Sequence, residues 1–212
     1  PDPYASYTVS ELWSYLSSYR LPSSAGSQYL YSNLGVSLLG HLLAAHLGDT
    51  YEAAVRRRVL DPLGMSSTMI TLDSDLAARA VDGHGPYRNR VRTWEMATLQ
   101  ASGSLRSTAE DMLLILEAYL GYRETPLDLA IEAQLIGAGE GPLSWGTSED
   151  GTFRHAGGKA GYRSGVAFNR TTGIGAVGAA VSGDPHDNAI DELIAAINKT
   201  GYKASRPSAQ EG

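Results

Sequence analysis

The spacing of apolar residues changes from helical to strand-like near Pro142, and this change constrains the fold more than any other feature. Before it, leucines recur every three or four residues, as on one face of a helix. After it, short runs of apolar residues end in glycine, asparagine or aspartate, as in strands joined by tight turns. A helical part over about 8–140, followed by an antiparallel sheet and a C-terminal helix over about 141–198, predicts an α+β fold.

Four helices are predicted from capping residues and apolar faces. They cover about 9–19, 33–47, 51–60 and 108–120. The first follows a capping box from Thr8 to Glu11, and the fourth follows a similar box from Ser107 to Glu110. Gly48 closes the second helix as a C-terminal cap.

Four strands are predicted beyond Pro142, over 143–149, 152–157, 162–169 and 174–182. Asp150-Gly151 and the segment 169–173 have the composition of hairpin turns, so the strands should form an antiparallel meander.

A single domain over 1–200 is expected, because the chain shows neither an internal repeat nor a linker. Residues 66–103 are predicted to be rich in loops, and 186–198 to form a last amphipathic helix. Residues 201–212 have too few apolar groups to be ordered alone and are expected to be a flexible tail.

The charge and composition exclude several classes of function. The 212-residue chain has a net charge of −6, which argues against binding to nucleic acid or to anionic membranes. No apolar run is long enough to span a bilayer, and no targeting signal is visible. Cysteine is absent, so disulfides and thiolate sites are excluded, and no metal or cofactor is indicated.

Tyr31 and Asn33 stand one residue apart, immediately before the second predicted helix. A phenol can accept a proton from a serine hydroxyl only if nearby cations favour its ionised form, and an asparagine side chain can hold both a carbonyl and an ammonium group. The alternative is structural, because asparagine is a favoured N-cap and tyrosine a common anchor. His155 and Gly157 form a similar pair on a predicted strand, where a histidine is often purely structural.

Four segments occur in an order that is typical of one family. They are Tyr31-Ser32-Asn33 after "PSSAGSQYL", "DPLGMSST", "ASGSLRSTAEDM" and "LSWGTSEDGTFRHAGGKAGYRSGVAFN". Over residues 7–198 the chain resembles the serine β-lactamase and penicillin-binding-protein superfamily, in its class C-like branch. That branch includes class C β-lactamases, D-alanyl-D-alanine carboxypeptidases, D-aminopeptidases and esterases.

The resemblance implies a role for each motif residue. Tyr31 would be the general base for acylation and the proton donor to the leaving group, and Asn33 would position the substrate. His155 would replace the lysine of the third motif, supplying a positive charge or a hydrogen bond. Gly157 would let the substrate approach the strand, and the Gly158 N–H would form one arm of the oxyanion hole. Histidine is only partly charged at neutral pH, so activity should change with pH in this region.

The nucleophile motif of the family, Ser-x-x-Lys, is absent. The chain has three lysines, and the residues three positions before them are Ala156, Ala196 and Thr200. The chain therefore resembles the C-terminal two-thirds of such an enzyme, with the strand 174–182 left as an unpaired edge. We expect an N-terminal segment or companion chain that carries Ser-x-x-Lys, unless the chain is a truncated product.

Two cationic features have alternative interpretations. Lys159 could line the rim of the substrate pocket or simply be exposed to solvent. Arg88, Arg90 and Arg92 could be loop charges, or they could recognise a substrate carboxylate, which a guanidinium binds through two hydrogen bonds.

The resemblance implies a serine hydrolase or acyltransferase that acts on small or peptide-like esters and amides through an acyl-enzyme. The alternative is an inactive member of the family that acts as a binding or scaffold protein, for which the missing nucleophile is the argument. The resemblance implies a secreted or periplasmic location if the protein is typical of the family, and the sequence leaves a cytoplasmic location open.

Overall fold

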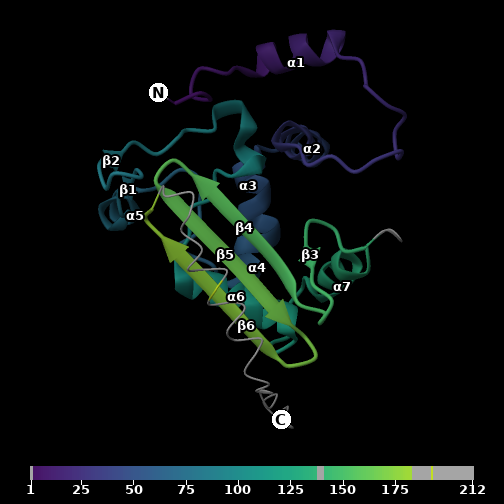
Figure 1. Cartoon of the computed structure of the whole chain (residues 1–212), viewed down its shortest axis with the longest axis vertical. Coiled ribbons are helices and arrows are strands. Elements are labelled where there is room, and N and C mark those ends of the chain that lie inside the picture. Colours follow the sequence, from purple (N-terminus) through teal and green to yellow (C-terminus); the bar gives the residue numbers. More distant parts are fainter. Residues whose placement is uncertain (1, 138–140, 183–191, 193–212) are drawn as a thin grey trace.

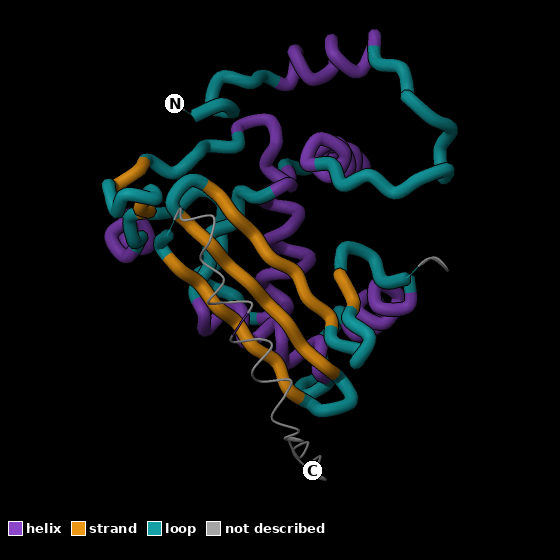
Figure 2. The backbone as a smooth tube through the Cα atoms, viewed as in Figure 1, coloured by secondary structure: helices purple, strands orange, loops and turns teal. Residues whose placement is uncertain are grey.

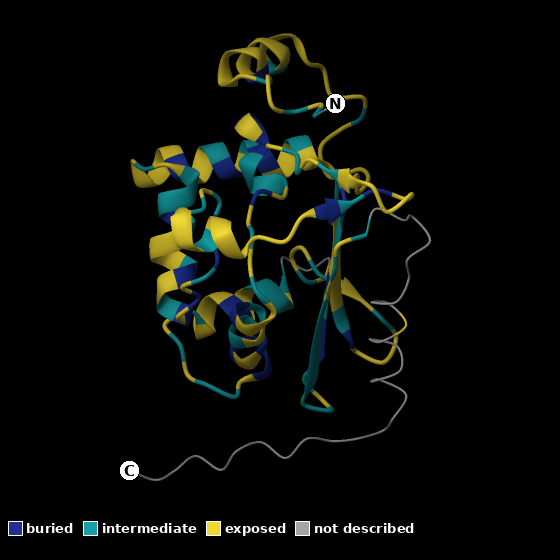
Figure 3. Cartoon of the chain, turned by 90° about the vertical axis from the view of Figure 1, so that its left-hand side faces the viewer, coloured by how far each residue is buried: buried dark blue, intermediate teal, exposed yellow. Residues whose placement is uncertain are grey.

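The computed structural model describes residues 2–137, 141–182 and 192, and it confirms the α+β class. Its centre is an antiparallel sheet with the strand order β3-β4-β5-β6 (Figures 1 and 2). The strands are β3 (Gly146–Thr147), β4 (Phe153–Lys159), β5 (Tyr162–Asn169) and β6 (Ile174–Ala180). With the sheet seen edge-on, the helices lie against one of its faces (Figure 3).

The predicted meander is confirmed, including both of its turns. Gly151 adopts a φ of +79° between β3 and β4, and the Gly173 N–H donates to the Asn169 carbonyl, 2.9 Å away, between β5 and β6. β4 begins one residue later than predicted and ends two residues later, at Lys159, and β3 covers only two residues of the predicted strand 143–149. Within the described residues, β6 pairs only with β5, so it is the unpaired edge that the sequence predicts.

The remaining elements belong to the helical part and to a small hairpin. The helices are α1 (Val9–Ser18), α2 (Asn33–Leu47), α3 (Tyr51–Val55), α4 (Asp61–Leu63), α5 (Ser74–Arg79), α6 (Ala109–Leu120) and α7 (Asp128–Ile136). A π-helical turn spans Arg56–Leu60, a 3-10 helix spans Ala97–Ser102, and β1 (Gly83–His84) pairs with β2 (Arg90–Val91).

Three of the predicted helices match the structure closely, but the N-caps of two of them lie one residue away from the predicted positions. α1 begins at the predicted capping box of Thr8. The N-cap of α2 is Ser32, whose hydroxyl accepts from the Gly35 N–H, so the alternative role of Asn33 as the cap is wrong. The N-cap of α6 is Thr108, and the predicted box from Ser107 is wrong.

The other departures fall in segments with weaker local signals. The third predicted helix is divided into α3 and the π-helical turn, and α4 follows directly and ends at Leu63. Pro62 lies at the start of α4, where a proline needs no N–H partner. The segment 66–103 contains α5, the β1–β2 hairpin and the 3-10 helix, and α7 lies where no helix is predicted. The predicted helix 186–198, apart from residue 192, and the tail 201–212 lie outside the described residues.

Phe168 of β5 is the centre of the hydrophobic core. It is 1% exposed, stacks on Phe153 with ring centroids 4.9 Å apart, and meets Tyr119 of α6 and Trp145 at 5.2 and 5.1 Å. Leu116 and Leu120 of α6 lie beneath β6, where a Cβ on Gly175 would come within 3.1 to 3.2 Å of them. Aromatic packing therefore joins α6 to the sheet.

A buried carboxylate links α6 to the loop after α4. Asp111 is 5% exposed, and its side chain accepts from the Ser67 N–H at 2.9 Å and from the Thr68 hydroxyl at 2.7 Å. Burial of a carboxylate is costly unless such donors surround it, so these bonds fix the start of α6 against this loop.

Among the described residues, no helix is long and apolar enough to cross a membrane, and no three His, Asp or Glu side chains gather as metal ligands would.

We predict that Phe168→Ala lowers the free energy of unfolding by about 3–5 kcal/mol, because it leaves a cavity at the centre of the aromatic cluster. Urea denaturation followed by circular dichroism measures this change. Leu129→Ala is the control: Leu129 is 88% exposed, and its loss should change the stability by less than about 0.5 kcal/mol. Equal effects of the two substitutions would contradict the assignment of the core.

Candidate functional site

Tyr31 and Asn33 lie at the N-terminal end of α2 and are both exposed. Tyr31 precedes the Ser32 cap and is 70% exposed, and Asn33 is the first residue of the helix. The helix itself is held against the 3-10 helix: the His41 ring nitrogen Nε2 lies 2.8 Å from the Thr98 carbonyl oxygen. A Cβ on Gly40 would come within 2.5 Å of the Ala101 side chain, so only glycine permits this approach.

His155, Gly157 and Lys159 lie on the helix-covered face of the sheet. The unbroken register of β4 and β5 runs from Phe153↔Phe168 to Lys159↔Tyr162, and alternate residues of a strand share a face. Phe168 faces the core, and its partner Phe153 lies on the same side of the sheet. The three residues that follow Phe153 at intervals of two therefore lie on this side as well. Even so, the His155 side chain is exposed, and its ring meets Trp145 edge-on at 6.4 Å.

The outer edge of β4 is open next to these residues. β3 pairs only with Phe153 and Arg154, so from His155 to Lys159 the outer side of β4 has no partner strand among the described residues. Gly158 lies in this open stretch. On the other side, a Cβ on Gly157 would come within 2.9 Å of the Ser164 hydroxyl.

The described residues do not join the two halves of the predicted site. Tyr31 and Asn33 belong to the helical part and His155 to the sheet, and no hydrogen bond or ring contact links them in the described chain. None of them lines the two described cavities, of about 520 and 500 Å³. Their assembly into one site therefore stays a prediction.

The tip of the β4–β5 hairpin is locked beneath the β1–β2 hairpin. Gly161 has a φ of +75°, and a Cβ there would lie 2.7 Å from the backbone of Gly83 and 2.4 Å from the Val91 side chain. The Thr93 hydroxyl donates to the Tyr162 hydroxyl at 3.0 Å, and Tyr162 donates to the Val81 carbonyl at 2.7 Å. This contact places the end of β4 beside residues 90–95.

Lys159 is partly buried at this end of β4. No hydrogen bond or ion pair joins its ammonium to another residue in the described part of the chain. Burial lowers the pKa of Lys159, and repulsion by Arg106 lowers it further, whereas Asp2 and Glu95 act in the opposite direction. The sequence allows two positions for Lys159, the rim of the substrate pocket or full exposure to solvent. Its partial burial excludes full exposure.

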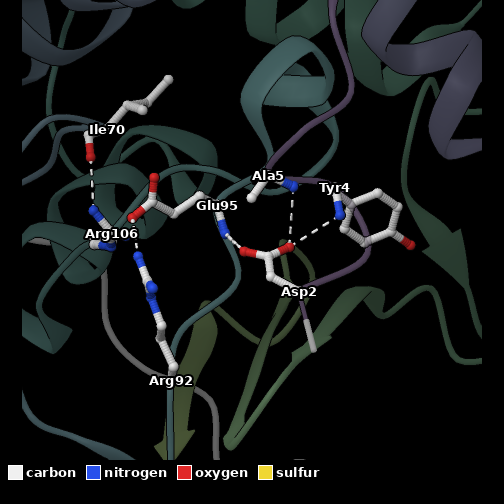
Figure 4. A network of polar contacts seen from close by, with 7 residues as sticks. All are labelled: Asp2, Tyr4, Ala5, Ile70, Arg92, Glu95 and Arg106. Atoms are coloured by element: carbon white, nitrogen blue, oxygen red, sulfur yellow. Dashed lines mark hydrogen bonds and ion pairs between the residues drawn. The ribbon is translucent and has the colours of Figure 1, made fainter.

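The neighbouring cavity of about 500 Å³ is lined by charges of both signs. Its charged residues are Asp82, Arg90, Arg92, Glu95 and Arg106. Arg90 pairs with Asp82 at 2.7 Å and Arg92 with Glu95 at 3.5 Å. Arg106 donates one N–H to the Ile70 carbonyl at 2.9 Å (Figure 4).

Asp2 closes this network from the N-terminal side. Its carboxylate accepts from the backbone N–H of Glu95 at 2.6 Å and from those of Tyr4 and Ala5 at 3.0 and 3.2 Å (Figure 4). The bond from Glu95 is the main reason that the pKa of Asp2 is lowered. Sequence reasoning missed Asp2, Glu95 and Arg106, and only the alternation of Arg90 and Arg92 gave a signal.

A second feature that sequence reasoning missed is the apolar surface of α1 and α2. Leu12 is the only large side chain of α1 that is fully buried, and most apolar side chains of these helices are exposed. The exposed large apolar residues of the two helices and of the segment that joins them are Val9, Trp13, Tyr15, Tyr19, Leu21, Tyr29, Leu30, Tyr31, Val36, Leu39, Leu42, Leu43 and Leu47. So many exposed apolar groups are typical of an interaction surface.

The sheet with helices on one face, and the helical part beside β4, define a β-lactamase/transpeptidase-like fold. The structure of the D-alanine carboxypeptidase AmpC from Burkholderia cenocepacia matches 93% of this chain and 68% of its own, with a TM-score of 0.81 and 22% identity. A class C beta-lactamase from Rhodobacter sphaeroides matches 94% of this chain and 67% of its own, with a TM-score of 0.80 and 20% identity.

A family model described as Beta-lactamase matches residues 1–199, so the chain belongs to this family of hydrolases. The D-alanyl-D-alanine-carboxypeptidase/endopeptidase AmpH of Escherichia coli is 36% identical over 118 residues, which are 53% of this chain and 29% of AmpH. A beta-lactamase of Pseudomonas fluorescens is 27% identical over 137 residues, 64% of this chain and 38% of its own length. The matched segments thus span well under half the length of these two relatives.

We predict that Lys159 titrates below the ordinary lysine value of 10.5. The folded chain then binds this proton less tightly than the unfolded chain, so folding stability rises with pH between the folded-state pKa and 10.5. Lys159→Gln should therefore be more stable than the wild type near pH 7, and the difference should shrink as the pH approaches 10.5.

NMR of chain labelled at the lysine Cε measures the titration directly, because only Lys159, Lys199 and Lys203 contribute signals. A Lys159 signal that titrates at 10.5 or above would contradict the prediction.

Proposed function

We propose that the chain is part of a β-lactamase-like serine hydrolase that cleaves esters or amides through an acyl-enzyme. The nucleophilic serine would lie on a segment that is not in this chain. The family and fold support the reaction class, and the open edge of β4 beside His155 is the observation that carries the proposal. A substrate can lie along such an edge and accept hydrogen bonds from it.

In this proposal the site residues take the roles that the family resemblance implies. Tyr31 takes the proton from the serine hydroxyl and returns it to the leaving group, and Asn33 holds the substrate. His155 assists Tyr31 with a positive charge or a hydrogen bond. The Gly158 N–H stabilises the negative charge on the carbonyl oxygen, and Gly157 leaves room for the acyl group.

Two observations support a missing segment that completes the fold. The chain covers only 67% and 68% of the two solved structures named above, whereas they cover 94% and 93% of it. The described chain also exposes the apolar surface of α1 and α2 and the edges of β4 and β6. A companion segment that packs on these surfaces would bury them and would bring the serine to Tyr31.

The inactive binding or scaffold protein is the second candidate, and the absence of Ser-x-x-Lys from the chain favours it. An active-site probe separates the two. We expect a fluorophosphonate or a fluorescent penicillin to label a serine on a segment that co-purifies with this chain, and mass spectrometry of the labelled peptide identifies it. If the native protein takes up neither probe while its relatives do, the scaffold function is correct instead.

We predict that Tyr31→Phe lowers the acylation rate of the labelled preparation by about 100-fold or more, because it removes the proton acceptor and leaves the ring. Stopped-flow measurement of probe uptake gives the rate. Tyr29→Phe is the matched control, since Tyr29 lies two residues away and is 87% exposed. A rate that is unchanged by Tyr31→Phe would remove Tyr31 from the mechanism.

A further inference from the structure

The Lys159 end of β4 has the features of a binding site for a negatively charged group. The ammonium is partly buried and has no hydrogen bond or ion pair in the described chain, although lysine can donate three hydrogen bonds. Arg106 repels the ammonium, whereas Asp2 and Glu95 attract it. A partly buried ammonium without a hydrogen-bond partner favours the binding of an anion, which supplies both charge and acceptors.

The adjoining cavity supplies further donors. Arg90, Arg92 and Arg106 line a space of about 500 Å³ together with the carboxylates of Asp82 and Glu95. Arg106 uses one N–H for the Ile70 carbonyl, and Arg92 contacts Glu95 only at 3.5 Å, so both guanidinium groups keep donors for a ligand.

The balance of charges selects the kind of anion. The cavity lining has three arginines and two carboxylates, and Lys159 beside it is countered by Asp2. One uncompensated positive charge suits a monoanion, whereas the two carboxylates of the lining would repel a dianion such as phosphate. A carboxylate is also planar and accepts two parallel hydrogen bonds from a guanidinium.

The position of Lys159 on β4 relates the cationic cluster to the proposed reaction. Lys159 follows Gly158 directly in the sequence. It lies on the same face of β4 as His155 and Gly157. Along a strand, Lys159 lies about 7 Å from Gly157 and about 13 Å from His155. An acyl group that extends from the Gly158 N–H towards the end of β4 would thus reach the ammonium within a few carbon atoms.

We infer that Lys159 and Arg106, with Arg92 at the cavity, bind a carboxylate on the acyl part of the substrate, so that the preferred substrates are esters or amides of dicarboxylic acids. This inference rests on the proposed function for the position of the reacting carbonyl. The anion site itself does not depend on the nucleophile and can be tested without it.

The test is a titration of the 212-residue chain with glutarate, followed by NMR of labelled backbone amides and the Lys159 Cε. We expect saturable shifts at Lys159 and at residues 90–95 and 106, and no such shifts with glutaramide, which has the same length and no charge. Lys159→Gln should weaken binding by about tenfold or more, because it removes a charge-assisted contact. Lys159→Arg should retain most of it.

Arg79→Gln is the matched control for loss of a cation, because Arg79 is exposed on α5 and makes no ion pair in the described chain, and it should bind glutarate as the wild type does. Circular dichroism checks that each variant is folded. Absence of glutarate binding, binding that Lys159→Gln leaves unchanged, or tighter binding of inorganic phosphate would each overturn the inference. Failure of the proposed function would look different, since no serine would be labelled while glutarate still bound.

Discussion

The contact of α6 with the sheet through Phe168 determines where the chemistry of this protein can lie. Phe168 is enclosed by aromatic rings from β4, from α6 and from the segment before β3. Once this side chain faces the helices, the two-residue period of a strand places His155, Gly157 and Lys159 on the same side. The orientation of the candidate site is therefore a consequence of core packing rather than of any contact within the site.

The fold was predictable from the sequence where local signals agree with one another. α1 combines a complete capping box with an apolar stripe, and the hairpin turns of the meander contain glycine or asparagine at the required positions. The errors arose where neighbouring residues compete. Both Ser107 and Thr108 can cap α6, and Ser107 instead lies 2.7 Å from the hydroxyl of Thr68, a partner that is distant in sequence. α7 has no side-chain cap at Leu127, so nothing local marks its start.

The candidate site was predictable to a smaller extent. The order of the motif segments indicated the family, which the match over residues 1–199 confirms. The environment of Lys159 was not predictable, because it is created by residues that are 53 to 157 positions away, from Arg106 to Asp2. Such contacts depend on how β1 and β2 meet the sheet, and a single sequence has no local pattern that reveals it.

At the close approach of Gly161 to Gly83, backbone atoms determine the shape of this region, whereas side chains determine its charge. The two hairpins touch through backbone atoms at a point where neither hairpin has room for a side chain. The main chain therefore sets their spacing. The cationic side chains stand around this contact without forming it. Exchange of a lysine or an arginine for a neutral residue would then alter the electrostatic potential at the end of the sheet and leave its framework in place. Among homologous proteins with this fold, single amino-acid substitutions would therefore suffice to change the charge of the ligands that bind here.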